Sequence, residues 1–497
     1  MEVSEIKRLI DDDYTSERKK LARIGQRYYE AEHDILEYRL FYYNTDGKLV
    51  EDEYRNNARI SHPFFTELSD QLSSYMLSFD ENPMQAKDTA EGLQDYLDEY
   101  FDDDFWTEIG ELITGTYNKG FEYIYAYKNK DGRMTFQCAD SMGVVEVRAK
   151  DTDDKCEYFI YWYTDRIEKG KKQIKRIQVW SAKETTYYVQ EGDGKIELDT
   201  EAEINPRPHV VFKDKKGEKK GYSFGFIPFW RLDNNRKRIS GLKPIKPLID
   251  DYDLMQCGLT NNLVDFDTPL YMVKGFDGDN LDELQQNLKV KKVVGVETDG
   301  GVEIKTIDIP YQARQAKASE DEKNIYRFGM GLNMTGLKDT AATTNIAIKA
   351  AYSLLDMKAN KLEKRLKRLL KELLRVVIDE INETNKTGYK ASDVNMVFKR
   401  SVMTNETENT QNEKVKAETQ QVQINTILAL TATLDDATIV KAICDVMDID
   451  YEEIKERLPK DESKQVEQAQ EELNNVITDE GGGTDESKAE GSAAGSS

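Results

Sequence analysis

The sequence has 497 residues, of which 33% are charged and 38% are hydrophobic, and its formal net charge at pH 7 is -24. This length accommodates several domains or one elongated subunit with a sizeable core. The 27 Tyr and 17 Phe residues exclude a chain that is disordered throughout. The acidic balance argues against tight nucleic-acid binding, which needs basic surface, but not against a protein that DNA slides past.

Charge is distributed unevenly along the chain. From Val402 to Ser497 there are 22 acidic and 8 basic residues, whereas from Asn345 to Arg375 nine Lys and Arg residues stand against three acids. The basic segment either pairs with acidic side chains of a neighbouring subunit, which we favour, or contacts DNA. The sequence leaves both alternatives open.

Cysteine usage and hydropathy indicate a soluble, unsecreted protein. Cys138, Cys156, Cys257 and Cys444 are far apart and form no CxxC pair, as expected of reduced thiols, so neither disulfides nor a zinc ribbon are predicted. Polar and charged residues follow Met1, and no run of about 18 apolar residues occurs. We therefore expect no membrane partner.

The first half of the chain changes from helical to strand periodicity. Apolar spacings of three and four predict a polar pair of helices within 1–46, then helices over 63–79 and 89–120. Period-two alternation starts at Phe121 and predicts an antiparallel β region as far as about Phe229. The clearest strands in this region are 158–163, 176–180, 185–189 and 209–212, with a hairpin turn at 129–132.

Two helices of similar length enclose a compact insert. The first is predicted over 244–266 and is ended by Pro269, and the second over 311–328. Within the insert, strand patterns cover 270–274, 290–296 and 302–307, and a helical pattern covers 281–288. The insert is therefore expected at the tip of a helical arm, an unusual shape for an enzyme.

The longest helix is predicted after a glycine-rich break at Gly329, Gly331 and Gly336. It runs from Thr344 to about Asn382 and carries one apolar stripe at spacings of three or four. The stripe consists of Ile348, Ala351, Leu355, Ala359, Leu362, Leu366, Leu369, Leu373, Val377 and Ile381. A strand over 394–398, an acidic helical region as far as 458, and a tail expected to be disordered complete the chain.

Motifs for catalysis or metal binding are missing from the sequence. His33, His62 and His209 lack metal-ligand spacing, and structural roles are favoured for all three; no Walker A sequence occurs. Asp277-Gly278-Asp279-Asn280 resembles a calcium loop, but wrong residues follow, so a turn is predicted. No enzyme activity, metal or other cofactor is expected.

Three stretches carry a family resemblance in their order along the chain. The first is Asn57-Ala-Arg-Ile-Ser-His-Pro-Phe-Phe65, which continues to Leu77. The second starts at Ile227-Pro-Phe229 and includes Asn234-Asn235, Leu248 to Asp253, Asn261-Asn262 and the strand before Lys274-Gly275. The third joins Asn324-Ile-Tyr326 and Gly331 to Asn345-Ile-Ala-Ile-Lys349 and Ser353 to Ala359. Together they resemble the portal proteins of the SPP1-like siphophage family.

The resemblance implies a helix-rich α+β portal subunit with wing, stem, clip and crown parts, which assembles into a ring around a central channel. The implied parts are N-terminal helices and a β-rich wing over 1–243, stem helix 244–266, α/β clip 267–310, stem helix 311–331, tunnel loop 332–344, long wing helix and strand 345–401, acidic helical crown 402–458 and disordered tail 459–497.

The resemblance also implies a function: a connector through which double-stranded DNA is packaged into and ejected from a capsid. Partners would be further copies of the chain in a ring of twelve, double-stranded DNA, terminase, head-completion or adaptor proteins, and major capsid and scaffold proteins. The protein would occupy the portal vertex of the virion and the host cytoplasm during assembly. Expected channel residues are Asn333, Thr335, Lys338, Thr340, Thr343 and Thr344, and expected docking residues are Lys274, Phe276, Asp277, Lys289, Lys291 and Lys292.

Two alternatives belong to other classes of protein. One is a virion scaffold or adaptor whose arm binds proteins without forming a channel. The other is a metal-dependent packaging nuclease that uses Asp102, Asp103 or Asp104, although a run of adjacent acids is more often a solvated face. Neither explains the ordered three-part resemblance.

Overall fold

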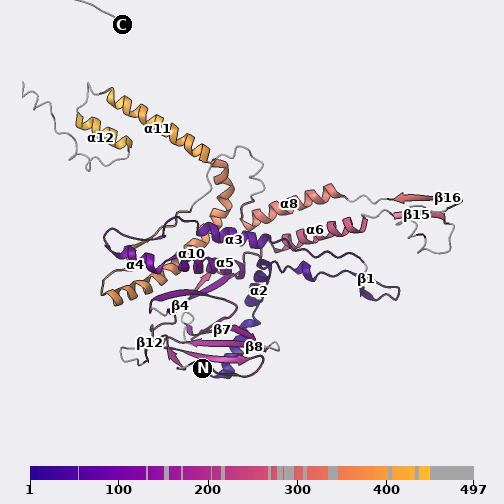
Figure 1. Cartoon of the computed structure of the whole chain (residues 1–497), viewed down its shortest axis with the longest axis horizontal. Coiled ribbons are helices and arrows are strands. Elements are labelled where there is room, and N and C mark those ends of the chain that lie inside the picture. The colour runs from indigo at the N-terminus through magenta and orange to yellow at the C-terminus, as the bar shows by residue number, and fades with distance from the viewer. Residues whose placement is uncertain are drawn as a thin grey trace, which may run out of the picture. The chain divides into compact units, whose positions relative to one another are not determined.

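The computed structural model describes most of the chain, in ranges separated by short gaps. These are 1–53, 55–129, 132–149, 156–168, 172–202, 204–213, 219–266, 270–276, 284, 296–305, 310–333, 345–400, 406–430 and 436–447. The chain divides into two compact units, Met1–Met403 and Thr404–Ser497. The fold mixes helices with antiparallel strands (Figure 1), which agrees with the predicted α+β class.

The N-terminal segment begins with the two expected helices, α1 (Val3–Tyr14) and α2 (Glu17–Tyr29). The prediction of helix as far as residue 46 was wrong beyond Tyr29. Ala31 takes a left-handed conformation with φ 59°, and a 3-10 turn, η1 (Asp34–Glu37), follows. Aromatic residues that favour strands then form the hairpin of β1 (Phe41–Tyr43) and β2 (Leu49–Glu51).

Three helices follow the hairpin along the chain, and each buries residues in the main hydrophobic core. They are α3 (Phe64–Met76), α4 (Leu93–Tyr100) and α5 (Asp103–Lys119). The helix predicted over 89–120 is therefore two helices. The chain breaks at Phe101, and the Asp102 carboxylate begins α5 by accepting a hydrogen bond from the Phe105 N–H at 3.0 Å. Gly120, with φ 92°, ends α5 and leads directly into the first strand of the β region.

The β region matches the period-two prediction. Its strands are β4 (Phe121–Lys128), β5 (Met134–Ala139), β6 (Val144–Arg148), β7 (Cys156–Glu168), β8 (Lys172–Trp180), β9 (Glu184–Glu191), β10 (Ile196–Leu198), β11 (Arg207–Pro208), β12 (Val210–Lys213), β13 (Lys219–Tyr222) and β14 (Phe229–Asp233). They form a β14-β4-β5 sheet, a β10-β9-β8-β7-β6 sheet with β11 beside β9, and a β12-β13 pair. Aromatic rings of Phe121, Tyr123, Phe159, Trp180 and Phe229 pack together in one cluster.

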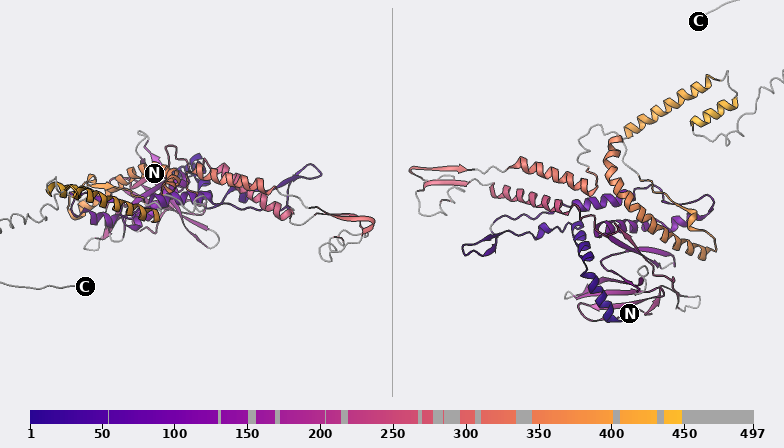
Figure 2. Two further views of the ribbon diagram at one scale, coloured as in Figure 1. Left: turned by 90° about the horizontal axis from the view of Figure 1, so that it is seen from above. Right: turned by 180° about the vertical axis from the view of Figure 1, so that it is seen from behind.

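The arm predicted around residues 244–331 is present. Its helices are α6 (Lys246–Phe266) and α8 (Tyr311–Gly329), which pack on each other. Between them β15 (Leu270–Phe276) pairs antiparallel with β16 (Val296–Lys305), so β16 begins earlier than predicted. The helix predicted over 281–288 and most of the strand over 290–296 lie outside the described residues. Both views in Figure 2 show the two helices extending from the body toward the β15–β16 pair.

The long helix α10 (Asn345–Asn385) confirms the longest predicted element. Its stripe from Leu355 to Ile381 is buried in the main hydrophobic core, where α10 packs against α3 and β14. After it, β17 (Val394–Met396) pairs with β3 (Met84–Ala86), although they are about 310 residues apart. Burial of one apolar face along many turns, rather than helix propensity alone, stabilises α10.

The second unit contains two described helices, α11 (Glu406–Leu428) and α12 (Asp436–Met447), as predicted for the acidic region. The predicted disordered tail lies outside the described residues. All four cysteines are free thiols. Among the helices that the structure describes, none has the length and apolar character needed to cross a membrane.

Candidate functional site

Only one of the predicted channel residues lies within the described chain. Asn333 follows α8, and its Nδ2 donates a hydrogen bond to Glu322 Oε1 of α8 at 3.3 Å. Thr335, Lys338, Thr340, Thr343 and Thr344 lie outside the described residues. The structure therefore positions the entry to the predicted loop, and the channel-facing role of these side chains stays a prediction.

The predicted docking residues are described in part. Lys274 of β15 forms an exposed cross-strand ion pair with Glu303 of β16, with 3.0 Å between Nζ and Oε1. The backbone of Phe276 pairs with Val296 after a register shift at this strand end. Asp277, Lys289, Lys291 and Lys292 fall in the undescribed part of the chain. The tip of the arm therefore carries polar side chains on a two-stranded ribbon.

The end of α8 is fixed to α3 just before the predicted loop. Gln71 brackets the backbone of Leu332, because its Oε1 accepts from the Leu332 N–H and its Nε2 donates to the Leu332 carbonyl, both at 2.9 Å. Gly331 packs so closely on Leu68 that a Cβ there would collide with it. These two hydrogen bonds from Gln71 anchor the start of the loop. The sequence pattern alone did not reveal them.

The loop base also contains a partly buried lysine from α10. Lys358 Nζ donates to the carbonyl oxygens of Gly329 at 3.1 Å and Leu68 at 3.3 Å, and it lies 4.0 Å from the centre of the Tyr117 ring. Burial lowers the pKa of Lys358 to about 7. One side chain of α10 thus joins α3 and the end of α8 through their backbones.

Other basic residues of α10 differ from Lys358 because their side chains are exposed or form an ion pair. Lys367 pairs with Glu363 at 2.8 Å. The side chains of Lys361, Lys364, Arg365 and Arg368 are exposed, and no ion pair is formed by them within the described part of the chain. Lys361 lines an open groove of about 840 Å³ together with Arg236, Lys237 and Lys243. The basic segment therefore exposes several cationic side chains that form no ion pair within the described residues, while Glu363 pairs with Lys367.

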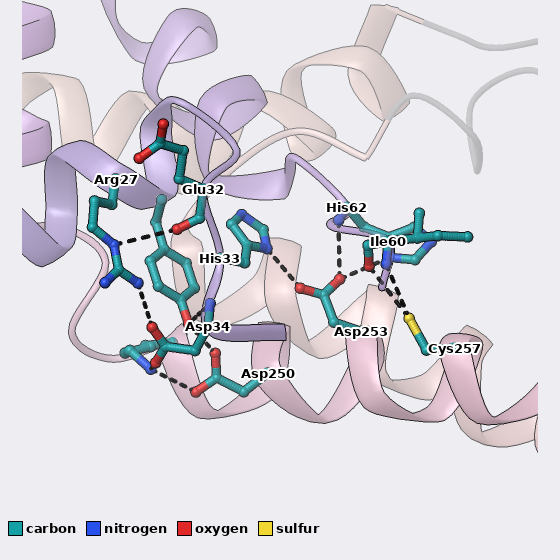
Figure 3. A network of polar contacts seen from close by, with 11 residues as sticks. Arg27, Glu32, His33, Asp34, Ile60, His62, Asp250, Asp253 and Cys257 are labelled. Atoms are coloured by element: carbon teal, nitrogen blue, oxygen red, sulfur yellow. Dashed lines mark hydrogen bonds and ion pairs between the residues drawn. The ribbon is translucent and has the colours of Figure 1, made fainter. Parts of the chain in front are cut away.

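The root of the arm is organised by Asp253 of α6, shown in Figure 3. His33 Nδ1 donates to Asp253 Oδ2 at 2.6 Å, while His62 donates to Oδ1 from its Nδ1 at 2.7 Å and its N–H at 2.9 Å. The side chains of His33 and Asp253 are 0% exposed. Burial would raise the pKa of Asp253, but the hydrogen bonds from both histidines lower it overall.

A second cluster joins α2 to α6 beside Asp253. The Tyr28 hydroxyl donates to Asp250, and Lys246 Nζ bridges Asp34 at 2.6 Å and Asp250 at 2.8 Å. Tyr28 also stacks on His33 with 4.4 Å between ring centres. Burial and the Asp250 carboxylate raise the pKa of Tyr28, so the hydroxyl stays a donor at neutral pH. These contacts attach the N-terminal segment to the arm.

The two arm helices are joined by a further ion pair. Lys317 of α8 contacts Asp321 on its own helix and reaches Asp251 of α6 at 2.6 Å. Hydrogen bonds to Asp251 and then Asp321 raise the pKa of Lys317. Because α6 and α8 also pack along their lengths, the arm is fixed both to the body and within itself.

His33 and His62 are structural, as predicted, but their shared partner was missed. The two histidines are 29 residues apart in the sequence, and both are far from Asp253 along the chain. No local spacing could therefore indicate the contact. His209 accepts a hydrogen bond from the Phe224 N–H at 3.3 Å and contacts the Ser181 carbonyl oxygen at 2.9 Å. Within the described residues, no group of three or more His, Cys, Asp or Glu side chains is arranged to hold a metal ion.

The sequence of this chain is similar to the sequences of known proteins. Residues 8–478 match the family described as "Phage portal protein, SPP1 Gp6-like". The portal protein of Bacillus phage SPP1 is 26% identical over 405 residues, which cover 81% of this chain and 78% of that protein. The portal protein of Clostridium phage phiCD119 is 24% identical over 428 residues, covering 82% and 88% of the two chains.

The matched region includes the arm, its root and the long helix, so the class of the protein is that of phage portal proteins. Within this class the chain belongs to the SPP1 Gp6-like portal protein family. The predicted family and portal function are thereby confirmed. The family is structural rather than enzymatic, and its members are virion components.

Proposed function

We propose that copies of this chain, twelve in the particle, close into a ring whose central channel conducts double-stranded DNA into and out of the capsid. The observation that carries this proposal is the α6–α8 arm, followed along the chain by a glycine-containing segment and then by α10, in a chain of the portal family. The arm supplies the stem over 244–266 and 311–331, and its tip over 267–310 supplies the clip.

The remaining parts follow the same order. The wing comprises residues 1–243 and 345–401, which share the main hydrophobic core. The loop over 332–344 faces DNA, and residues 402–458 form the crown, which is followed by the tail over 459–497. Support for separating the crown comes from the division of the chain into two compact units near residue 403.

The loop touches DNA through a few short polar groups rather than a basic surface. An acidic protein with net charge -24 releases few counterions from DNA, so the duplex is free to slide. Asn333, Lys338 and the loop threonines are the contacts. Gln71 and Lys358 hold the base of the loop in place relative to α3 and the end of α8.

The tip of the arm docks the packaging motor and, later, the proteins that complete the head. Lys274, Lys289, Lys291 and Lys292 give this tip cationic groups, and its two-stranded ribbon offers exposed edges. Capsid and scaffold proteins are further partners during assembly in the host cytoplasm. The cations of α10 face acidic residues of the neighbouring copy rather than DNA.

Negative-stain electron microscopy of the purified chain, with its mass in solution, tests the proposal. Rings with a central hole are the expected result. A compact dimer under all salt conditions would instead favour an adaptor without a channel, and magnesium-dependent DNA cleavage that is lost on substituting Asp102, Asp103 and Asp104 would favour a nuclease.

The role of the loop has a separate test in assembled particles. Lys338→Glu should reduce the amount of DNA packaged, because it places a negative charge against the phosphates. Lys183→Glu, an exposed change in the β region, is the control. Packaged DNA that is equal in the two variants would contradict the assignment of the loop, even if rings form.

A further inference from the structure

The β1–β2 hairpin forms a sheet on its own. Phe41, Tyr42 and Tyr43 pair with Glu51, Val50 and Leu49, and the sheet has only these two strands. Its turn is closed by Asn44, whose Oδ1 accepts from the N–H groups of Asp46 at 3.0 Å and Lys48 at 2.9 Å. An isolated two-stranded hairpin is at best marginally stable in water, so this one requires additional packing.

Both faces of the hairpin are apolar and uncovered. Alternation places Phe41, Tyr43 and Leu49 on one face, where they are 53%, 74% and 58% exposed, and Tyr42 and Val50 on the other. In Figures 1 and 2 no described helix or further strand covers either face. An uncovered apolar patch of this kind, bordered by polar residues, indicates a protein contact.

A second uncovered apolar set lies at the far end of the arm. Leu263 and Val264 near the end of α6, and Tyr311 at the start of α8, are all more than half exposed. Because α6 and α8 pack on each other and are joined through β15 and β16, these three residues belong to the same end of the arm. The first unit therefore carries two different apolar surfaces.

We propose that the hairpin of one copy docks on the arm of the next copy, with the Phe41–Tyr43–Leu49 face against Leu263, Val264 and Tyr311. The proposal rests on the ring assembly proposed above. A ring closes through a head-to-tail contact, which joins two different surfaces of each copy. The two apolar sets meet this requirement on one chain.

Polar groups around the hairpin fit the border of such an interface. Arg39 pairs with Glu51 at 2.7 Å at the base of the hairpin, and Asp46 and Lys48 are exposed at its turn. A central apolar contact with a charged rim is the usual composition of a specific protein interface. The tyrosine at the most exposed position is among the residue types that contribute most to binding.

Three variants of the full chain test this contact. The hairpin variant carries Phe41→Ser, Tyr43→Ser and Leu49→Ser, and the arm variant carries Leu263→Ser, Val264→Ser and Tyr311→Ser. A control variant carries Leu198→Ser and Tyr222→Ser, which change exposed apolar residues of the β region. Circular dichroism spectra should match the wild type, because the altered side chains lie on the surface.

Ring formation is then measured by mass in solution and electron microscopy. The hairpin and arm variants should each assemble at least about tenfold more weakly than the wild type, and the control should not. Mixed together, the two defective variants should form one-to-one dimers that do not close, because only one competent pair of surfaces remains. A hairpin variant that forms rings like the control would overturn the proposal.

Cross-linking tests the contact without removing it. A photoreactive phenylalanine analogue at Tyr43 in mixed isotope-labelled and unlabelled copies should join that position to α6 or α8 of another copy. Cross-links within one copy, or only to another protein, would refute a second copy as the occupant. If the wild type forms no rings at all, the proposed channel function fails instead, so the two failures are distinguishable.

Discussion

The root and the tip of the arm differ in how their polar residues are held. At the root, Asp253 is buried and accepts hydrogen bonds from both His33 and His62. At the tip, the Lys274–Glu303 pair is exposed on a two-stranded ribbon. Buried charged networks fix geometry at a high cost if broken, whereas exposed pairs contribute little. The difference indicates that the root fixes the arm to the body, whereas the tip has an exposed polar surface, as the proposed docking role requires.

Removing the Asp253 carboxylate should have the largest effect on stability. Asp253→Ala leaves His33 and His62 without their acceptor, and we expect the free energy of unfolding to fall by about 3 kcal/mol in urea titrations. Asp251→Ala, two residues earlier in α6, is the matched control. It removes a partly exposed contact to Lys317 and should cost less than about 1 kcal/mol. Equal losses would contradict the contrast between buried and exposed pairs.

The Asp253 carboxylate should also make the stability of the folded protein sensitive to acid. Burial raises the pKa of Asp253, the histidines lower it more, and the folded-state pKa lies below the unfolded value of about 3.9. Its contribution is therefore present above that pH and is lost as the pH falls through the folded pKa. The stability difference between wild type and Asp253→Asn should shrink below pH about 4, and a constant difference would count against this account.

Lys358 should give the next largest effect, visible as a pH dependence. Its folded pKa of about 7 lies below the unfolded value of about 10.4, so between these values the unfolded chain binds more protons. Stability of the wild type should therefore rise by up to about 1.4 kcal/mol per pH unit relative to Lys358→Met. Urea unfolding at pH 7, 8 and 9 measures this. Exposed Lys361→Met is the control, and parallel profiles for wild type and Lys358→Met would disprove the lowered pKa.

Gln71→Ala should act locally at the base of the loop. Loss of its two hydrogen bonds to Leu332 should increase hydrogen exchange of the Leu332 amide about tenfold, equivalent to about 1.4 kcal/mol. Gln26→Ala, which removes only a surface contact to Glu30, should leave that amide unchanged. Unchanged exchange in the Gln71 variant would show that other contacts anchor the loop.

Lys274→Ala should have the smallest effect on stability, at most about 0.5 kcal/mol, because its pair with Glu303 is exposed. Its effect should appear in binding, as weaker association of assembled rings with the terminase measured by co-sedimentation. Lys183→Ala is the control for a general loss of positive charge. A large fall in melting temperature for the Lys274 variant would show that the tip is structural rather than a docking surface.

Periodic apolar patterns in the sequence predicted the helices and strands better than the contacts between them. The stripe along α10, the paired arm helices and the antiparallel strands follow from local periodicity, and the structure confirms them. The hairpin at 41–51 was missed because β1 lies within the segment up to residue 46 that was interpreted as helical, and the three residues of β2 just after it are too few to show a period-two pattern. The roles of the loop over 332–344 and of residues 277–292 stay predictions, since these residues are outside the described chain.

Contacts between distant segments could not be predicted in this way. Asp253 was included in a recognised motif, but its pairing with His33 and His62 depends on how η1 and the segment before α3 fold against α6. The Gln71 contact with Leu332 joins positions 261 residues apart. Such pairings are set by packing of the whole unit, which a single sequence does not report.

The open edges of the β1–β2 hairpin affect how the protein must be made. Among the described residues, each strand has one edge without a partner strand, so its backbone N–H and C=O groups can pair with an extended segment of another chain. A newly synthesised copy therefore faces two competing outcomes, closure with its correct neighbours or edge-to-edge aggregation. Edge-to-edge aggregation is opposed by the shortness of the ribbon and by the charges around it, which belong to Arg39, Asp46, Lys48 and Glu51. A single copy can therefore remain unaggregated until it joins the ring.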